Sequence, residues 1–324
     1  MRWSTPALVA AAVLLSACGT TETPTTTATT ASEGAGGPVT LTDVRGKEVK
    51  LDAPAQKVVA LEWAEAEMVA SLGVMPVGVA DVAGYQAWDK ATPLDGSVKD
   101  VGTRNEPSVD SIVALDPDVV IMAQGRDTTL AERLEQYVPV VVTKASDASR
   151  NFDRLREDLN LVAQAVGKTT EADTLLDEMD QALADGKKAV ADKGAAGTPF
   201  VMADGWLEGS TVTIRPFGKG SLVSDTAEAL GLVNAWTGEV DPQWGLGSTD
   251  VEGMTAITDP KTVLFYSASE DDVFTTGLAQ NPVWQRLPFV TSGKVVKLEA
   301  GTWTFGGPKS VVRVAEQFVK AVTA

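Results

Sequence analysis

The sequence predicts an α/β fold of two lobes, each built on a largely parallel sheet. Beyond Pro38, short β-rich runs alternate with longer helical patterns, which is typical of strands and helices packed in layers. The strand candidates form two groups, and a stretch without strand signal separates them at residues 152 to 192. About 285 residues follow the threonine-rich start, enough chain for two lobes that each bury a core.

The chain begins with a predicted lipoprotein signal peptide, residues 1–17. Arg2 is its basic region, and Ala7 to Leu15 form an apolar run that is too short to span a bilayer. The following "LSAC" resembles a bacterial lipobox, in which the cysteine receives diacylglycerol. We therefore expect Cys18 to attach the mature protein to the outer face of the cytoplasmic membrane, because two or three acyl chains give durable anchoring. The alternative is an ordinary cleaved signal that leaves a free thiol.

Residues 18–37 are predicted to be a disordered tether, since Thr, Pro, Ala, Ser and Gly offer little to bury. The 324 residues carry a formal charge of −17, which disfavours nucleic acid and anionic lipid as partners. The chain has no histidine and one cysteine. A Ser-His-Asp triad, a Cys-His pair, an imidazole-ligated metal site and a disulfide framework are therefore excluded.

Strands are predicted from short apolar runs. The first group is "KVVALE", "PVGVAD", "PDVVIMA" and "PVVVT" at residues 57–143, and the second is "PFVMADG", "TVTIRP", "KTVLFYSA" and "KVVKLEA" at residues 199–300. Two comparable helices are expected, one starting at an N-cap on Ser108 and one ending at Gly231. Residues 281–299 indicate a short helix, a turn and a last strand.

Two helical patterns separate the strand groups, with Gly167 between them. Residues 168–193, which are apolar on one face and charged on the others, are predicted to form one long helix. This helix would join an N-terminal lobe at 38–167 to a C-terminal lobe at 194–324. Periodicity alone leaves open a helix that packs only on the first lobe.

The tryptophans are mostly predicted at the ends of strands or in glycine-rich loops. In parallel α/β sheets the loops past the carboxyl ends of the strands form the ligand crevice, where aromatic rings make a rigid, partly apolar wall. Packing within the core or between lobes is the alternative for any one of them. They are Trp63, Trp88, Trp206, Trp236, Trp244, Trp284 and Trp303.

Three arginines are predicted in loops: Arg104 in "GTRNEP", Arg126 in "AQGRDTT" and Arg215 in "TIRPFG". A guanidinium offers a planar fork of donors to carboxylate, hydroxamate or phenolate oxygens. We expect Arg104 and Arg126 to converge on one rim of the cleft, because each follows a strand of the first lobe. The alternative is a solvated surface arginine with a local partner such as Glu106 or Asp127.

The order of these motifs resembles the periplasmic ferric-hydroxamate binding proteins. "KVVALEWAEAEMVASLGVMPVGVADVAGYQAW" and "VGTRNEPSVDSIVALDPDVVI" are similar to the first lobe of that family, and "WGLGSTDVEGM" and "NPVWQRLPFVTSGKVVKLEAGTWTFGG" to its second. The resemblance covers residues 38–324. It implies the siderophore- and cobalamin-type periplasmic binding protein fold, with one long inter-lobe helix. It also implies that the protein is the substrate-binding component of an ABC importer, which delivers a ferric siderophore to the permease.

The resemblance also implies which residues contact the ligand. Arg126 and Phe305 stand where the family has tyrosines, and Arg215 has no clear counterpart. Those changes add positive charge and remove hydroxyl donors, so a carboxylate or citrate-type siderophore is expected beside the hydroxamate type. The expected ligand contacts are Trp63, Trp88, Arg104, Arg126, Arg215, Trp244, Ser248, Trp303 and Phe305.

In the related importers one acidic residue per lobe docks on permease arginines, and Asp110 and Glu228 occupy the matching places. Iron is expected only inside the ferric siderophore, with no cofactor and no metal bound by the protein, and we expect a monomer. A cobalamin or haem binding protein of the same fold is the nearer alternative, although haem needs a His, Tyr or Met axial ligand. A secreted carboxylate-dependent enzyme is the further one, and no spacing singles out a catalytic pair.

Overall fold

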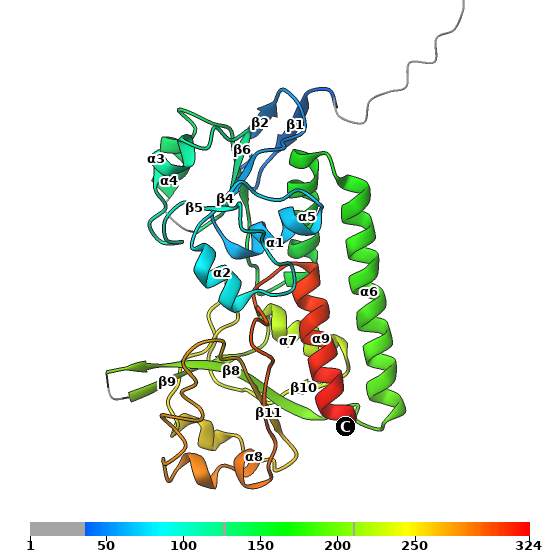
Figure 1. Cartoon of the computed structure of the whole chain (residues 1–324). Coiled ribbons are helices and arrows are strands. Elements are labelled where there is room, and N and C mark those ends of the chain that lie inside the picture. Colours follow the sequence, from blue (N-terminus) through cyan, green and yellow to red (C-terminus); the bar gives the residue numbers. More distant parts are fainter. Residues whose placement is uncertain (1–35, 126–127, 210) are drawn as a thin grey trace, which may run out of the picture. The chain divides into compact units, whose positions relative to one another are not determined.

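The structure is a computed structural model that describes residues 36–324, except 126–127 and 210 (Figure 1). Cys18 and Arg126 therefore lie outside the described residues. Within the described part of the chain, every helix is too short or too polar to cross a membrane.

The N-terminal lobe is built on a parallel sheet of strand order β5-β4-β3-β6-β7. Because strand side chains alternate between faces, α1 and α5 cover one face of this sheet and α3 and α4 cover the other. A separate antiparallel hairpin, β1–β2, precedes the sheet. The elements are β1 (Val39–Thr42), β2 (Glu48–Leu51), β3 (Val58–Ala60), α1 (Trp63–Ser71), β4 (Gly78–Val79), α2 (Val82–Trp88), β5 (Lys99–Asp100), α3 (Val109–Val113), β6 (Val119–Ala123), α4 (Thr128–Leu134), β7 (Val140–Thr143) and α5 (Asn151–Val166).

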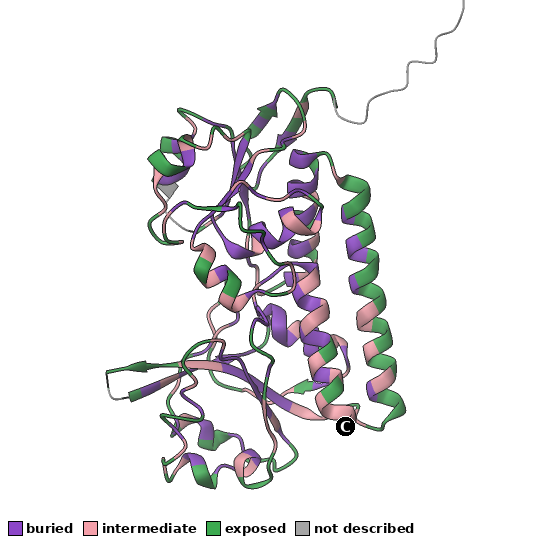
Figure 2. Cartoon of the chain, viewed as in Figure 1, coloured by how far each residue is buried: buried purple, intermediate pink, exposed green. Residues whose placement is uncertain are grey.

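The C-terminal lobe repeats the layering around the parallel strands β10-β8-β11-β12, with β9 antiparallel to β8. The helices α7 and α9 cover one face, and η1, η2 and α8 cover the other. Figure 2 shows the buried residues along the strands and on the inward helix faces of both lobes. The elements are β8 (Pro199–Glu208), β9 (Thr211–Phe217), α7 (Leu222–Ala229), β10 (Val233–Asn234), η1 (Gly253–Ala256), β11 (Val263–Tyr266), η2 (Trp284–Arg286), α8 (Pro288–Thr291), β12 (Val295–Lys297) and α9 (Pro308–Thr323).

One long helix, α6 (Thr169–Asp192), runs along both lobes (Figure 1). Its first half contributes Leu175, Leu176 and Met179 to the core of the N-terminal lobe, and Val190 belongs to the core of the C-terminal lobe. The predicted two-lobe α/β fold with an inter-lobe helix is thus confirmed, and the alternative of a helix on the first lobe alone is wrong. Gly167 separates α6 from α5 because the chain there takes φ 69°, a left-handed conformation that suits glycine.

A buried carboxylate, Glu67 of α1, holds the start of α9 from the other lobe. It accepts hydrogen bonds from the backbone N–H of Gly307 at 2.8 Å, the N–H of Ser310 at 3.0 Å and the Ser310 hydroxyl at 2.6 Å. The two backbone N–H groups are donors that the start of a helix leaves unpaired, and a negative charge is favourable there. Asp89 lies next to Glu67, and its pKa is raised to about 9, mainly by burial and further by the charge of Glu67.

Every predicted strand is present, and so are the two comparable helices, α3 and α7, each of which starts at a serine N-cap. The Ser108 hydroxyl accepts from the N–H of Ser111 at 3.2 Å, and that of Ser221 accepts from the N–H of Ser224 at 3.3 Å. The sequence did not predict the β1–β2 hairpin or the two-residue strands β5 and β10. Trp284 belongs to the core of the C-terminal lobe, so the core alternative applies to that residue.

Candidate functional site

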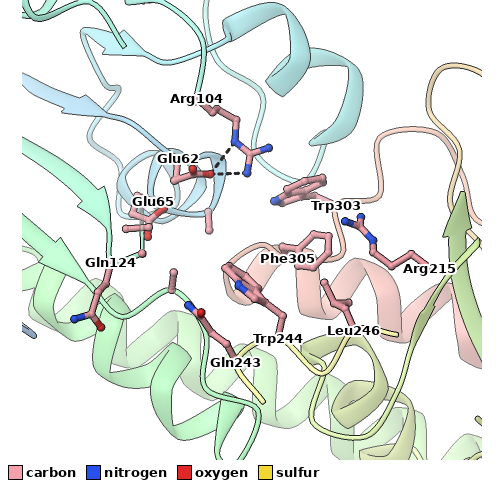
Figure 3. Close-up of a pocket in the computed structure, with 14 residues that line it drawn as sticks. Glu62, Glu65, Arg104, Gln124, Arg215, Gln243, Trp244, Leu246, Trp303 and Phe305 are labelled. Atoms are coloured by element: carbon pink, nitrogen blue, oxygen red, sulfur yellow. Dashed lines mark hydrogen bonds and ion pairs between the residues drawn. The ribbon is translucent and has the colours of Figure 1, made fainter. Parts of the chain in front are cut away.

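A cavity of about 400 Å³ is lined by residues from both lobes (Figure 3). On the N-terminal side its wall comes from the chain that follows β3, β6 and β7. The strand order reverses between β3 and β6, and α/β sheets bind ligands in the crevice outside the carboxyl ends at such a point. The polar lining residues are Glu62, Glu65, Arg104, Gln124, Arg215 and Gln243, and the aromatic ones are Trp244, Trp303 and Phe305.

Arg104 is held by an ion pair with Glu62. Its Nε donates to Oε2 of Glu62 at 2.7 Å, and its Nη2 lies 2.5 Å from the same oxygen. The guanidinium also stacks on Trp63, with Cζ 4.2 Å from the ring centroid, and lies 5.5 Å from the Trp303 ring. These contacts fix the guanidinium in the cavity wall, where its remaining N–H donors can meet a ligand.

Arg215 is the second cavity arginine, and the prediction that it lies in a loop is wrong. It is a residue of β9, opposite Asp204 of β8 in the antiparallel register. Its Nε donates to Oδ1 of Asp204 at 2.9 Å, and its Nη2 lies 2.5 Å from Oδ2. The guanidinium is 5.3 Å from the ring of Phe305. The strand and the bidentate pair therefore orient Arg215 more firmly than a loop would.

An aromatic cluster forms the C-terminal wall of the cavity. The ring centroids of Trp303 and Phe305 are 5.1 Å apart, and the rings of Trp244 and Phe305 are 5.7 Å apart at 80°. Trp303 also meets Trp63 edge to face at 4.8 Å, which joins the rings of the two lobes. Among the described residues the buried Nε1 of Trp303 has no hydrogen-bond partner. This wall offers a ligand apolar ring faces.

Short polar interactions place these rings. Trp303 and Phe305 lie in the loop that ends at Gly307, whose backbone N–H donates to the Glu67 carboxylate at the start of α9. The Asp241 carboxylate accepts from the N–H of Trp244 at 2.7 Å and from the N–H of Leu246 at 2.9 Å, which folds that loop into a tight turn. The rings therefore sit on loops with fixed ends.

A family model for periplasmic binding proteins matches residues 58–301. The chain belongs to the periplasmic binding protein family. It is 27% identical over 271 residues to the iron(3+)-hydroxamate-binding protein FhuD of Escherichia coli K12, covering 82% of this chain and 86% of that protein. It is 28% identical over 289 residues to the Fe(3+)-citrate-binding protein YfmC of Bacillus subtilis 168, covering 86% and 84%.

Solved structures show the same fold. The siderophore binding protein FhuD of Vibrio cholerae, bound to Fe3+-Desferal, aligns with a TM-score of 0.73 and 25% identity. The alignment covers 83% of this chain and 98% of that one. The petrobactin-binding protein YclQ of Bacillus subtilis aligns with a TM-score of 0.71 at 19% identity, over 89% and 99% of the two chains. Both alignments thus cover more than four fifths of this periplasmic binding protein.

The structure brings together five of the expected ligand contacts, Arg104, Arg215, Trp244, Trp303 and Phe305, around the cavity. The other described ones lie elsewhere. Trp63 lies under Arg104, where it donates to the carbonyls of Ala80 and Asp81. Trp88 meets the Trp303 ring edge to face at 6.3 Å, and its Nε1 donates to Oε2 of Glu270 at 3.0 Å. Ser248 is exposed and does not line the cavity, and Arg126 lies outside the described residues.

Four polar lining residues of this periplasmic binding protein were not predicted: Glu62, Glu65, Gln124 and Gln243. Two of them could have been identified from their place at the carboxyl ends of predicted strands. Glu62 is the last residue of the predicted strand "KVVALE" at residues 57–62, and Gln124 follows the one at 117–123, so both lie at carboxyl ends in the crevice. The arginine partners Glu62 and Asp204 replace the local partners that the sequence suggested for surface arginines.

Glu65 is the buried acid of the cavity wall. Its Oε1 accepts from the Thr143 hydroxyl at 2.5 Å, and its Oε2 has no hydrogen-bond partner among the described residues. Burial, reinforced by the negative charge of Glu62, raises the pKa of Glu65 to about 7, and the Thr143 hydrogen bond opposes this only in part. The carboxyl group therefore changes charge near neutral pH.

The raised pKa of Glu65 predicts how stability depends on pH. The folded protein holds this proton more tightly than the unfolded chain, whose ordinary value is 4.5. Protonated Glu65 therefore contributes to the free energy of unfolding fully below pH 4.5. This contribution, about 3 kcal/mol in total, is lost as the pH rises through 7. We expect Glu65→Gln to gain stability relative to wild type between pH 5 and pH 8, measured by urea unfolding. Glu106→Gln removes an exposed carboxylate and is the control. Parallel pH profiles for Glu65→Gln and wild type would contradict the assignment.

Proposed function

We propose that the protein is the extracytoplasmic substrate-binding component of an ABC importer and captures a ferric siderophore between its two lobes. The cavity carries this proposal, because its aromatic wall faces two oriented guanidinium groups. A ferric siderophore presents an apolar organic shell and metal-bound oxygens. Rings bury the shell, and charge-assisted hydrogen bonds of about 1.5–3 kcal/mol each can meet the oxygens. The iron then needs no ligand from the protein, and the proposed role is binding without catalysis.

The charge of the cavity favours a siderophore complex of low net charge, such as a hydroxamate complex. Each described cavity arginine already has a carboxylate partner, Glu62 for Arg104 and Asp204 for Arg215. Glu65 adds a further acid that is half ionised near pH 7. A citrate complex brings several carboxylates into this site and would meet little net positive charge from the described residues. We therefore favour the hydroxamate type over the citrate type.

Haem binding receives no support from the cavity. Its described lining residues contain no tyrosine, methionine or cysteine, the usual axial ligands that remain in a chain without histidine. Tyr85 is buried and donates to the carbonyl of Thr92 at 2.6 Å. Tyr266 lies 3.1 Å from the Asp272 carboxylate, and Tyr137 is on the surface. No observation favours cobalamin or an enzymatic reaction.

Titration of the protein with ferric desferrioxamine B, ferric citrate, haem and cobalamin, followed by tryptophan fluorescence, tests this function. We expect saturable quenching by the hydroxamate complex. Arg104→Ala should weaken that binding by about 10- to 150-fold, because it removes charge-assisted hydrogen bonds from a partly desolvated site. Arg286→Ala, an exposed arginine of η2, is the matched control and should bind as wild type does. Binding of haem or cobalamin alone would contradict the proposal.

We also propose that Cys18 carries the lipid that attaches the protein to the outer face of the cytoplasmic membrane. The support is the lipobox-like "LSAC" sequence and the polar segment of residues 19–35, which separates the cysteine from the described fold. The folded part would then act as a tethered monomer.

Cys18→Ala should release the protein from the membrane while leaving ligand affinity unchanged, since the anchor and the cavity belong to separate parts of the chain. Fractionation of cells into membrane and soluble material, followed by titration of the released protein, measures both effects. A Cys18→Ala protein that stays with the membrane would exclude lipid on this cysteine as the attachment.

Asp110 of α3 and Glu228 of α7 remain the proposed contacts with the permease. Both are exposed, and they lie on capped helices of different lobes. Reversal of both charges in Asp110→Lys with Glu228→Lys should abolish uptake, because like charges across an interface repel, while ligand affinity in vitro stays within a few-fold. Asp173→Lys with Asp177→Lys on the exposed side of α6 makes the same charge change and should leave uptake intact. Equal uptake by both double variants would remove Asp110 and Glu228 from this role.

A further inference from the structure

The β8–β9 hairpin projects from the C-terminal lobe (Figure 1) and carries two exposed apolar residues. Trp206 is 43% exposed and Leu207 is 55% exposed. They are neighbours in β8, so their side chains lie on opposite faces of the hairpin.

The strand register places Trp206 on the cavity side of the hairpin. Asp204 pairs with Arg215 across the two strands, and Trp206 pairs with Thr213. Since side chains two residues apart share a face, Trp206 is on the same face as the Asp204–Arg215 ion pair. Leu207 pairs with Val212, which belongs to the core on the other face.

Arg215 connects Trp206 to the cavity. Its Cζ lies 5.6 Å from the centroid of the Trp206 ring and 5.3 Å from that of Phe305. Arg215 and Phe305 both line the cavity, whereas Trp206 does not. One guanidinium thus lies beside a ring inside the cavity and a ring outside it, so Arg215 joins the edge of the cavity to the outer part of the hairpin.

We propose that Trp206 is an outer ligand contact, on which the apolar chain of a siderophore packs while its iron centre occupies the cavity. This inference rests on the proposed function. The cavity of about 400 Å³ is near the lower end of the range of roughly 300–1,000 Å³ that encloses drug-sized ligands, so a larger ligand extends past Arg215. A tryptophan gives that chain a large rigid surface at little cost in conformational entropy.

Two probes separate the iron centre from the chain. Ferric desferrioxamine B and ferric acetohydroxamate present the same hydroxamate oxygens, but only the first links them through a chain of methylene segments joined by amide groups. Trp206→Ala should weaken binding of ferric desferrioxamine B by about 5- to 30-fold and change binding of ferric acetohydroxamate less than twofold. Trp206→Phe keeps an aromatic surface and should recover most of the affinity. Calorimetry is the measurement, since the substitution removes a fluorescent residue.

Leu207→Ala is the matched control. It removes a more exposed apolar side chain from the adjacent position on the opposite face, and it should bind both complexes as wild type does. Equal affinity of Trp206→Ala and Leu207→Ala for ferric desferrioxamine B would overturn the inference. This comparison does not need measurable binding of the weaker acetohydroxamate complex.

A wild-type protein that binds ferric citrate alone would also overturn the inference, because citrate has no such chain. Wild-type protein that binds none of these complexes would contradict the proposed function itself. Equal thermal midpoints of the variants confirm that they are folded.

Discussion

The buried carboxylate of Glu67 is the interaction on which the arrangement of the site depends. Glu67 belongs to α1, whose start also carries Glu62 and Glu65 of the cavity wall. Its three hydrogen bonds hold Gly307 and Ser310 at the start of α9, directly after the loop of Trp303 and Phe305. One group from the first lobe therefore fixes the loop that supplies the aromatic wall of the second. A fully buried charge is stable there because three donors and the helix dipole compensate its lost hydration.

The cavity arginines illustrate a second constraint, the cost of burying charge. A guanidinium withdrawn from water needs a partner, and Glu62 and Asp204 supply carboxylates to Arg104 and Arg215 in the free protein. Both arginines also lie against aromatic rings, which restricts their rotamers before a ligand arrives. The result is a pair of preorganised donors with little net charge. Recognition then depends more on shape and on hydrogen-bond direction than on long-range attraction.

Local pattern was sufficient for most of the fold. Buried parallel strands are continuous apolar runs, so β3, β6, β7, β8 and β11 could be recognised from the sequence. The β1–β2 hairpin was missed because "VTLT" and "EVKL" bury only every second residue and look like polar loop. The cavity was predicted in part, since the aromatic and arginine side chains gave a chemical signal. Glu65 gave none, because an acidic residue in the first turn of a helix is ordinary until its burial is known.

The sequence by itself determined the two α/β lobes and the long helix between them. It also determined the polar segment that precedes the fold and the aromatic and arginine content of the crevice. Hydrophobic period, capping residues and glycine breaks are properties of neighbouring positions, and they act before the chain is packed. Only the tertiary structure decided which charges meet. Arg104 and Glu62 are 42 positions apart, and Ser310 and Glu67 are 243 apart. No local spacing encodes such pairs. The Arg104–Glu62 pair forms only when the strands of the N-terminal lobe bring their following loops together, and the Ser310–Glu67 pair forms only when the two lobes meet.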